Sequence, residues 1–338
     1  MSVFEQAANG AAGLYGYRQL LEAGFSDEEI RSARGAGSLV RLYRGVYALG
    51  LLSPAPGGAV RGSPDSRRSG AIPPWWCPTA SAAVLHNIPL WRIDPTVVHL
   101  TKDAGGGSAR TPGRLVHAAT VTEGEIATLN GILLTSVART LVDLCRFSGF
   151  ESAVIACDHA LQQRLVGPAE LALALEGARH RPGNAAARRA VGFADGRAES
   201  PGESRTRVLM HRLGLAPPEL QIDVHDRFHT ALGRTDLGYV EDAALIEFDG
   251  KVKYGKSLRP GGNRSEVVVR EKLREDAIRA VGTSVLRIVW LELDRPQVIE
   301  QRIIETRRQG RALRSAGAMS GTLCPRPAIR AAATRGDH

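Results

Sequence analysis

The stretch TDLGYVEDAALIEFDG, residues 235–250, predicts two antiparallel strands that are joined by a tight turn. Side chains alternate between the two faces of a strand, so the apolar residues of both strands fall on one face. The acidic residues then share the opposite face; they are Asp236, Glu247 and Asp249.

Two registers of this hairpin bring the acids together. A two-residue loop sets Asp236 across from Glu247, and a four-residue loop sets it across from Asp249. Close like charges are costly without a cation, so either register predicts that these three residues hold Mg²⁺, which would activate a water for attack on a phosphodiester. The lysines that follow are candidates to hold the phosphate: Lys251, Lys253 and Lys256. The alternative is an edge hairpin whose polar face is merely solvated.

The segments around the hairpin predict a mixed α/β arrangement. Pro201-Gly202 begins a helix with Glu203 in its first turn, and an alternating strand containing Gln221 follows. The order of Glu203, Gln221, Asp236, IEFDGKVKY, REDAIRAVG and VLRIVW resembles the very-short-patch-repair-like branch of the restriction-endonuclease-like (PD-(D/E)XK) superfamily over residues 201–310.

This resemblance implies a mixed sheet flanked by helices and a Mg²⁺-dependent DNA endonuclease. The catalytic residues that it implies are Glu203, Asp236, Glu247, Asp249 and Lys251. Two alignments of the motif are possible. Glu247-Phe248-Asp249 has the E-x-D-G form that relatives commonly carry and is preferred, although Asp249 then stands where the motif has lysine; Asp249-Gly250-Lys251 matches the motif literally.

The helix expected at residues 265–281 has two interpretations. The resemblance sets Asp276 and Arg279 at positions that support the site or the DNA strand. The simpler interpretation is pairing of Glu275 with Arg279, four residues apart on a solvated helix, which we favour.

The N-terminal residues predict a winged helix. Ser26 and Glu29 form a capping box at the start of a helix, and LVRLYRGVYALG at residues 39–50 predicts a hairpin. This segment resembles the N-terminal winged helix of AbiE-type antitoxins, which are regulatory partners in type IV toxin–antitoxin systems. The DNA-binding residues that this implies are Arg18, Arg31, Arg34, Arg41 and Arg44. The acids of residues 27–29 would repel phosphates, so a protein-interaction winged helix is the alternative.

The middle of the chain predicts a linker and a spacer. Residues 53–74 are rich in Pro, Gly, Ser and Arg, and SVARTLVDLCRF at residues 136–147 predicts a packed helix with a surface ion pair between Arg139 and Asp143. Alanine-rich helices follow, broken at Gly167-Pro168 and Pro182-Gly183. The histidines of this region have no ligand partners at metal-site spacing and are expected to be ordinary polar residues: His86, His99 and His117.

The whole chain of 338 residues is long enough for several domains. The expected division is a winged helix at 1–52, a flexible linker at 53–74, a central α+β and helical spacer domain at 75–200, the nuclease-like domain at 201–310, and a basic disordered tail at 311–338.

The composition limits the class of protein. Lys plus Arg number 44 against 35 Asp plus Glu, a net charge of +9 that favours DNA as a partner or reflects an arginine-rich proteome. The 4 cysteines are scattered, which predicts neither zinc nor disulfides. Without a leader or a long apolar segment, a cytoplasmic protein with no membrane partner is expected.

Two functions remain open at this stage. One is a Mg²⁺-dependent DNA endonuclease. The other is an antitoxin-like, DNA-binding transcriptional regulator with an inactive nuclease fold and a toxin partner.

Overall fold

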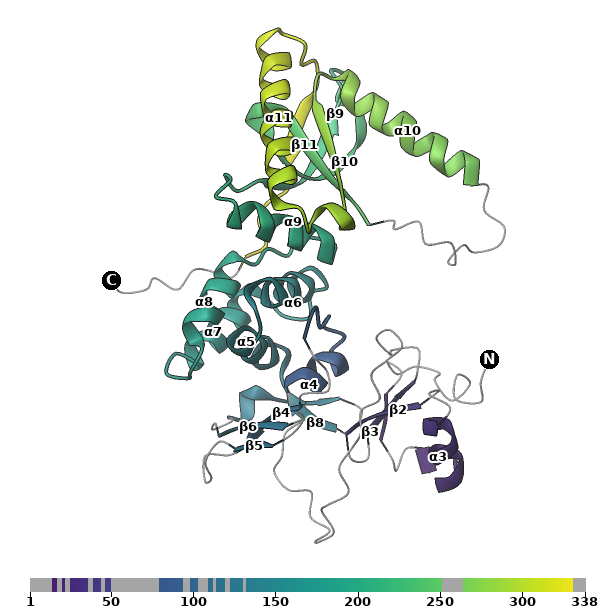
Figure 1. The fold of residues 1–338 in the computed structure, drawn as a ribbon, viewed down its shortest axis with the longest axis vertical. Coiled ribbons are helices and arrows are strands. Elements are labelled where there is room, and N and C mark those ends of the chain that lie inside the picture. Colours follow the sequence, from purple (N-terminus) through teal and green to yellow (C-terminus); the bar gives the residue numbers. More distant parts are fainter. Residues whose placement is uncertain are drawn as a thin grey trace. The chain divides into compact units, whose positions relative to one another are not determined.

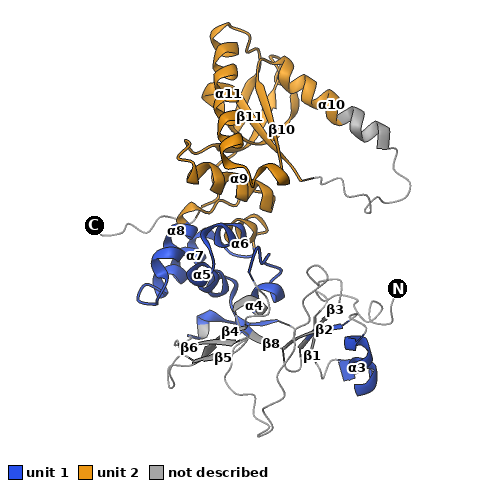
Figure 2. Cartoon of the chain, in the orientation of Figure 1, with its two compact units in different colours: residues 1–156, 165–191, 333–338 blue, residues 157–164, 192–332 orange. Residues whose placement is uncertain are grey.

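The computed structural model describes residues 14–16, 20–21, 25–35, 39–43, 46–49, 79–93, 98–102, 109–111, 114–118, 122–129, 132–250 and 264–330. The chain forms two compact units (Figure 2), and each is described by itself. The first unit comprises residues 1–156, 165–191 and 333–338, and the second comprises residues 157–164 and 192–332. The predicted linker at 53–74 lies outside the described residues.

The N-terminal part of the first unit contains a helix and a small antiparallel sheet. The helix α3 (Asp27–Gly35) precedes the hairpin of β2 (Leu39–Tyr43) and β3 (Val46–Leu49), and β1 (Leu14–Gly16) pairs with β3. The capping box is confirmed, because the Glu29 N–H donates to Ser26 Oγ at 3.3 Å and the Ser26 N–H donates to Glu29 Oε2 at 2.8 Å. A buried cluster that includes Ile30 and Tyr47 joins these elements.

The rest of the first unit combines short strands with helices. The helices are α4 (Thr79–Leu85), α5 (Val137–Phe147), α6 (Phe150–Gln162), α7 (Pro168–Gly177) and α8 (Asn184–Phe193), of which α6 and α8 continue into the second unit. The strands are β4 (Val98–Lys102), β5 (Ala109–Thr111), β6 (Arg114–Ala118), β7 (Ile126–Leu129) and β8 (Ile132–Thr135). The helix breaks predicted at 167–168 and 182–183 are confirmed.

The predicted ion pair between Arg139 and Asp143 of α5 forms, but it is buried and does not lie on the surface as expected. Arg139 is 1% exposed, and its Nε donates to Asp143 Oδ2 at 2.7 Å. Arg146 approaches Asp143 at 2.6 Å, and Glu125 lies 2.7 Å from Arg139 NH1. Because α5 is buried along nearly its whole length, the two charges face protein instead of water.

The second unit is built on a mixed sheet with the order β12-β11-β10-β9-β13. Its strands are β9 (Glu219–His225), β10 (Ala231–Tyr239), β11 (Ala244–Asp249), β12 (Ser284–Val289) and β13 (Thr322–Pro325). Only β11 and β12 run parallel; the other neighbours are antiparallel. The predicted mixed sheet flanked by helices is confirmed.

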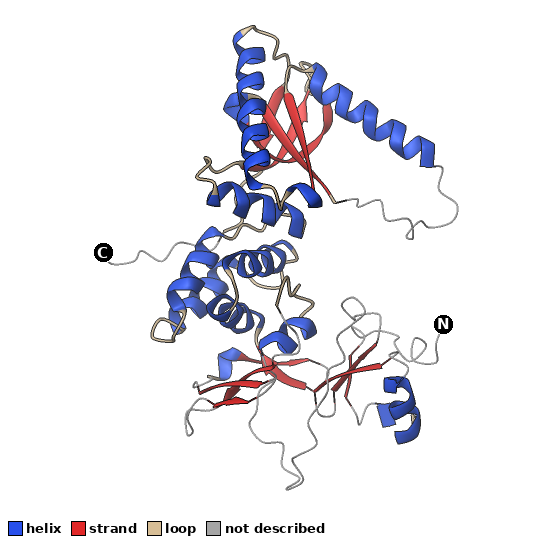
Figure 3. Cartoon of the chain, in the orientation of Figure 1, coloured by secondary structure: helices blue, strands red, loops and turns tan. Residues whose placement is uncertain are grey.

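Helices cover both faces of this sheet: α9 (Pro201–Arg212), α10 (Arg264–Ala280) and α11 (Pro296–Ser315). One apolar core joins Leu237 and Ile246 to α9 and α11, and the other joins Leu245 to Ile278 of α10. Figures 1 and 3 show α11 and α10 on opposite sides of the strands. The acid-bearing face is therefore partly covered by α10 instead of being fully open to solvent.

The expected disordered tail at 311–338 was wrong for the residues up to 330. The last helix extends to Ser315, which lies inside the expected tail, and β13 then pairs antiparallel with β9. Leu323 is buried against the second apolar core, which gives this segment a reason to order. Residues 331–338 lie outside the described part. Across the described ranges, no helix is long and apolar enough to cross a membrane.

Candidate active site

The hairpin of β10 and β11 has the first of the two predicted registers. Leu237 pairs with Ile246 and Tyr239 with Ala244, so the same register continued by one residue sets Asp236 across from Glu247. The strands are joined by the turn Val240–Asp242 and Ala243, so the connection is longer than the two-residue loop with which this register was associated. The cross-strand pairing of the two acids was therefore predictable, and the loop was not.

Asp236 is a half-buried carboxylate at the centre of the site. Its Oδ2 accepts the backbone N–H of Phe248 at 2.7 Å, which fixes the side chain over β11. Burial raises the pKa of Asp236 to about 6, and the nearby charges of Glu247 and Glu199 add to the increase. The carboxyl therefore takes up a proton at a higher pH than an exposed aspartate does.

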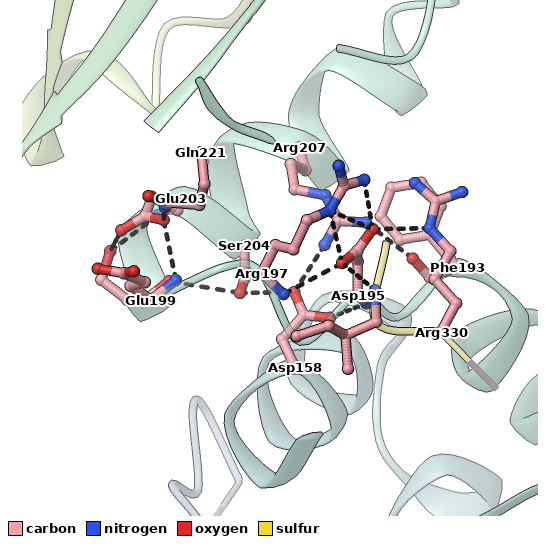
Figure 4. A network of polar contacts seen from close by, with 12 residues as sticks. Asp158, Phe193, Asp195, Arg197, Glu199, Glu203, Ser204, Arg207, Gln221 and Arg330 are labelled. Carbon is pink, nitrogen blue, oxygen red and sulfur yellow. Dashed lines mark hydrogen bonds and ion pairs between the residues drawn. The ribbon is translucent and has the colours of Figure 1, made fainter. Parts of the chain in front are cut away.

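Glu203 reaches the same site from the first turn of α9. Ser200 caps this helix: its Oγ accepts the Glu203 N–H at 3.2 Å and its hydroxyl donates to Glu203 Oε1 at 2.7 Å. The other oxygen accepts the Glu199 N–H and the Gln221 side-chain amide, each at 2.9 Å (Figure 4). Burial, together with the nearby charge of Asp236, raises the pKa of Glu203 to about 7. Glu203 is thus positioned to hold or release a proton near neutral pH.

Gln221 has a strained backbone beside these acids. It lies within β9 with φ 53° and its side chain is 2% exposed. The β9–β10 register, in which Thr235 pairs with Ile222 and Leu237 with Leu220, sets Gln221 across from Asp236. A residue with a side chain in the left-handed region costs about 1 to 3 kcal/mol, and such strain clusters at functional sites.

Glu247 and Asp249 are held by arginines that the sequence interpretation did not assign to the site. Arg274 NH2 of α10 lies 2.7 Å from Glu247 Oε1, and Arg287 NH2 of β12 lies 3.4 Å from Glu247 Oε2. Arg287 NH1 also lies 3.7 Å from Asp249 Oδ2. Guanidinium groups therefore offset part of the negative charge for which a divalent cation was expected.

A second polar network holds α9 in place (Figure 4). The Ser204 hydroxyl and Arg207 NH1 donate to Asp158 Oδ2 at 2.7 and 2.8 Å, and the Asp195 N–H donates to Asp158 Oδ1 at 2.7 Å. Burial opposes the charge of Asp195, but hydrogen bonds from Arg197 and Arg330 outweigh it and lower the pKa to about 2. Because Ser204 follows Glu203 directly, this network fixes the helix turn that carries Glu203.

The acids fit a hard cation by their chemistry. Carboxylate oxygens are the ligands that Mg²⁺ prefers, and the hairpin register places Asp236 and Glu247 across from each other on neighbouring strands. Asp236 and Glu247 are the residues that would hold the ion, with Asp249 beside them. In the part of the chain that the structure describes, however, no group of three His, Cys, Asp or Glu side chains is arranged as a metal site. Binding therefore requires the side chains, and the arginines on Glu247, to rearrange.

Comparison with known proteins finds relatives that match most of this chain. An uncharacterised protein of Mycobacterium tuberculosis, found in strains CDC 1551 / Oshkosh and ATCC 25618 / H37Rv, is 28% identical over 256 residues, which is 75% of this chain and 86% of the relative. No protein-family model matches the chain.

The remaining site predictions fall mainly on residues that are not described. Lys251, Lys253, Arg18 and Arg44 lie outside the described residues, and only the backbone of Arg41 is described, in β2. Arg31 and Arg34 are exposed on α3.

The other polar candidates have ordinary partners. Arg279 pairs with Glu275 at 2.8 Å and Asp276 is exposed, as the simpler interpretation of α10 expected. His86 contacts the Thr135 carbonyl at 2.7 Å, and burial lowers its pKa, so it packs as a neutral ring.

The residues that sequence reasoning missed had a partial signal. Arg287 follows Leu286 in the apolar run VLRIVW, and a lone cation in such a strand needs an acidic partner. The parallel register pairs Arg287 with Glu247, which no local pattern reveals.

Proposed function

We propose that the second unit is a Mg²⁺-dependent endonuclease domain that hydrolyses phosphodiester bonds in DNA. The observation that carries this proposal is the meeting of Glu203, Asp236 and Glu247 from three elements, with two of their pKa values raised toward neutrality. Functional sites are where buried acids with such shifts concentrate.

Each residue has a role in this proposal. Asp236 and Glu247 hold the metal ion, which when bound lowers the pKa of a water and offsets the charge of the phosphate. Glu203 accepts or donates a proton within the site. The water oxygen forms a bond to phosphorus, one P–O ester bond breaks, and the departing sugar oxygen takes up a proton.

DNA is the polyanion that the rest of the chain suits. The net charge is +9, and the exposed Arg31 and Arg34 lie on α3 ahead of the β2–β3 hairpin. Arginines on such a helix would contact the duplex while the second unit cuts it. The setting of this activity would be the cytoplasm.

A plasmid-nicking assay with Mg²⁺ tests the endonuclease proposal. The wild-type protein should convert supercoiled plasmid to open circle, and Asp236→Asn should remove that activity because the neutral amide is a poor ligand for Mg²⁺. Asp226→Asn is the matched control: Asp226 lies in the β9–β10 turn and accepts the Phe228 and Thr230 N–H groups, as an asparagine oxygen also can. Equal nicking by Asp236→Asn and wild type, or none by wild type, overturns the proposal.

A second function has its own support. Asp249 stands where the motif has lysine, and Glu247 is paired with Arg274 and Arg287. These facts favour a nuclease fold that is kept as an inactive scaffold. The resemblance of the N-terminal segment to AbiE-type antitoxins supports a DNA-binding transcriptional regulator with a toxin partner as the function of such a chain.

This regulator should bind DNA without metal, with an affinity that falls as salt increases. Binding should survive replacement of Asp236, Glu247 and Asp249 by their amides, and should weaken in the double variant Arg31→Ala, Arg34→Ala. A protein that shows no metal-free binding at low salt is not such a regulator.

A further inference from the structure

Glu247 is the meeting point of the acids and the arginines in the second unit. Both of its carboxylate oxygens have a cationic neighbour, with Arg274 NH2 at 2.7 Å from one and Arg287 NH2 at 3.4 Å from the other. A metal ion and a guanidinium group compete for the same oxygen because both are attracted by the same charge. Metal binding by Glu247 therefore has to displace the closer arginine.

Arg274 has further partners besides Glu247, so its guanidinium can leave Glu247 without losing all of its hydrogen bonds. Its NH2 also donates to Glu271 Oε1 at 2.9 Å, and its NH1 donates to the Arg234 carbonyl at 3.2 Å. The stem runs past Gly233, where a Cβ would lie 3.2 Å from Arg274 Cδ. Its side chain is 27% exposed while that of Glu247 is 10% exposed, so the guanidinium lies between the buried acid and solvent.

Arg287 is the second cation beside Glu247, and its closest partner is a different acid. Parallel pairing of β11 with β12 holds it directly beside Glu247, and its shortest ion pair, 2.9 Å, is with Glu275 of α10. It also lies 3.7 Å from Asp249. Arg287 thus links α10 to the sheet and divides its contacts among several acids.

The chemistry of the proposed reaction leaves a role for one more cation. Phosphodiester hydrolysis builds negative charge on the phosphate oxygens, and the preferred motif alignment has Asp249 where a lysine would offset that charge. A planar guanidinium binds phosphate oxygens through paired donors and stays charged at every working pH.

We propose that Arg274 supplies this cation: it rests on Glu247 in the free protein and transfers to the scissile phosphate when Glu247 turns to the metal ion. This inference rests on the proposed endonuclease function. Arg274 then competes with the metal ion in the free protein and acts as a catalytic residue during the reaction. Its removal should therefore raise the metal affinity and lower the rate of hydrolysis.

The test compares the full-length Arg274→Gln variant with Arg308→Gln. Arg308 pairs with Glu305 at 2.7 Å on α11 and is 70% exposed, so its replacement removes the same charge from an ion pair away from the site. Titration calorimetry with Mn²⁺ should show binding to Arg274→Gln about tenfold tighter than to wild type. Plasmid nicking by this variant should fall about a hundredfold, as for loss of a group that stabilises transition-state charge. Arg308→Gln should match wild type in both measurements.

Three outcomes separate this inference from the function on which it rests. If Arg274→Gln leaves both metal affinity and nicking unchanged, Arg274 is only a structural ion-pair partner of Glu247. If Arg274→Gln nicks faster than wild type, Arg274 only blocks metal binding. Either result overturns the inference while the endonuclease proposal stands. If wild type itself does not nick, the endonuclease proposal falls and this inference falls with it. Arg274→Lys, which keeps a cation and should retain part of the nicking, replaces Arg274→Gln if the latter does not fold by circular dichroism.

Discussion

Glu203 links the chemistry of the site to the stability of the second unit. Its carboxyl accepts donors from Ser200, Glu199 and Gln221, yet burial and the charge of Asp236 raise its pKa from 4.5 to about 7. A group with a raised folded-state pKa stabilises the fold below its unfolded pKa, and this stability is lost as the pH rises through the folded pKa.

Glu203→Gln should remove this pH dependence. Wild-type stability should fall as the pH rises from about 4.5 to about 7, because the folded protein must then bury a charge. The amide can keep the oxygen that accepts the Glu199 and Gln221 donors while its NH2 faces Ser200. Above pH 7 the variant should be more stable by up to about 3 kcal/mol, from 1.36 kcal/mol per pKa unit. Urea unfolding at several pH values measures this, and an unchanged slope between pH 5 and 7 contradicts it.

The start of α9 lies in close contact with β11. A Cβ on Gly202 would overlap the Phe248 ring, so only glycine allows the helix to begin at this place. The same contact brings Glu203, the next residue, over the acids of the hairpin.

Gly202→Ala should therefore destabilise the fold by about 1 to 3 kcal/mol, the usual cost of overpacking. Gly192→Ala is the control, because a Cβ at Gly192 in α8 has nothing within 4 Å, and it should raise stability by roughly 0.5 to 1 kcal/mol through a better helix residue. Thermal unfolding of the two variants checks the difference. Equal melting temperatures would show that the ring moves aside at little cost.

Local patterns predicted much of these elements. Alternation fixed β9, β10 and β11, and the Ser26 and Glu29 pair marked the start of α3, because each signal lies within a few residues. The same alternation placed Asp236 and Glu247 on one face, whereas Glu203 was assigned to the site only by the family resemblance. The burial of Arg139 and the ion pair of Arg274 with Glu247 were not predicted, since each depends on which distant element packs against the helix.

In the second unit as a whole, residues 329–330 bind back to residues 195–196. Arg330 Nε donates to the buried Asp195 at 2.7 Å, and the Gly196 N–H donates to the Ile329 carbonyl at 2.8 Å. These contacts join segments more than a hundred positions apart in the sequence. The composition of residues 311–338 predicted disorder and gave no sign of these contacts. A segment rich in Arg, Ala and Pro can become ordered when one of its arginines pairs with a buried carboxylate.

Arg330→Ala should destabilise the protein by about 1 to 2 kcal/mol at neutral pH, toward the low end for a hydrogen bond to a charged group because the Arg330 side chain is 45% exposed. Asp195 has a pKa lowered from 3.8 to about 2, so its stabilisation is present above pH 4 and is lost as the pH falls toward 2. The gap between the variant and wild type should close over the same range. Arg308→Ala, at an exposed pair, should stay within about 0.5 kcal/mol of wild type in urea unfolding.

The strand β13 forms one edge of the sheet in the second unit. It covers the side of β9 that would otherwise offer unpaired backbone groups, and it is only four residues long and ends at Pro325. A short outer strand with a proline is a poor template for a further strand, so it discourages the edge-to-edge aggregation to which open sheets are prone. A chain cut before Thr322 should therefore lose solubility as well as stability.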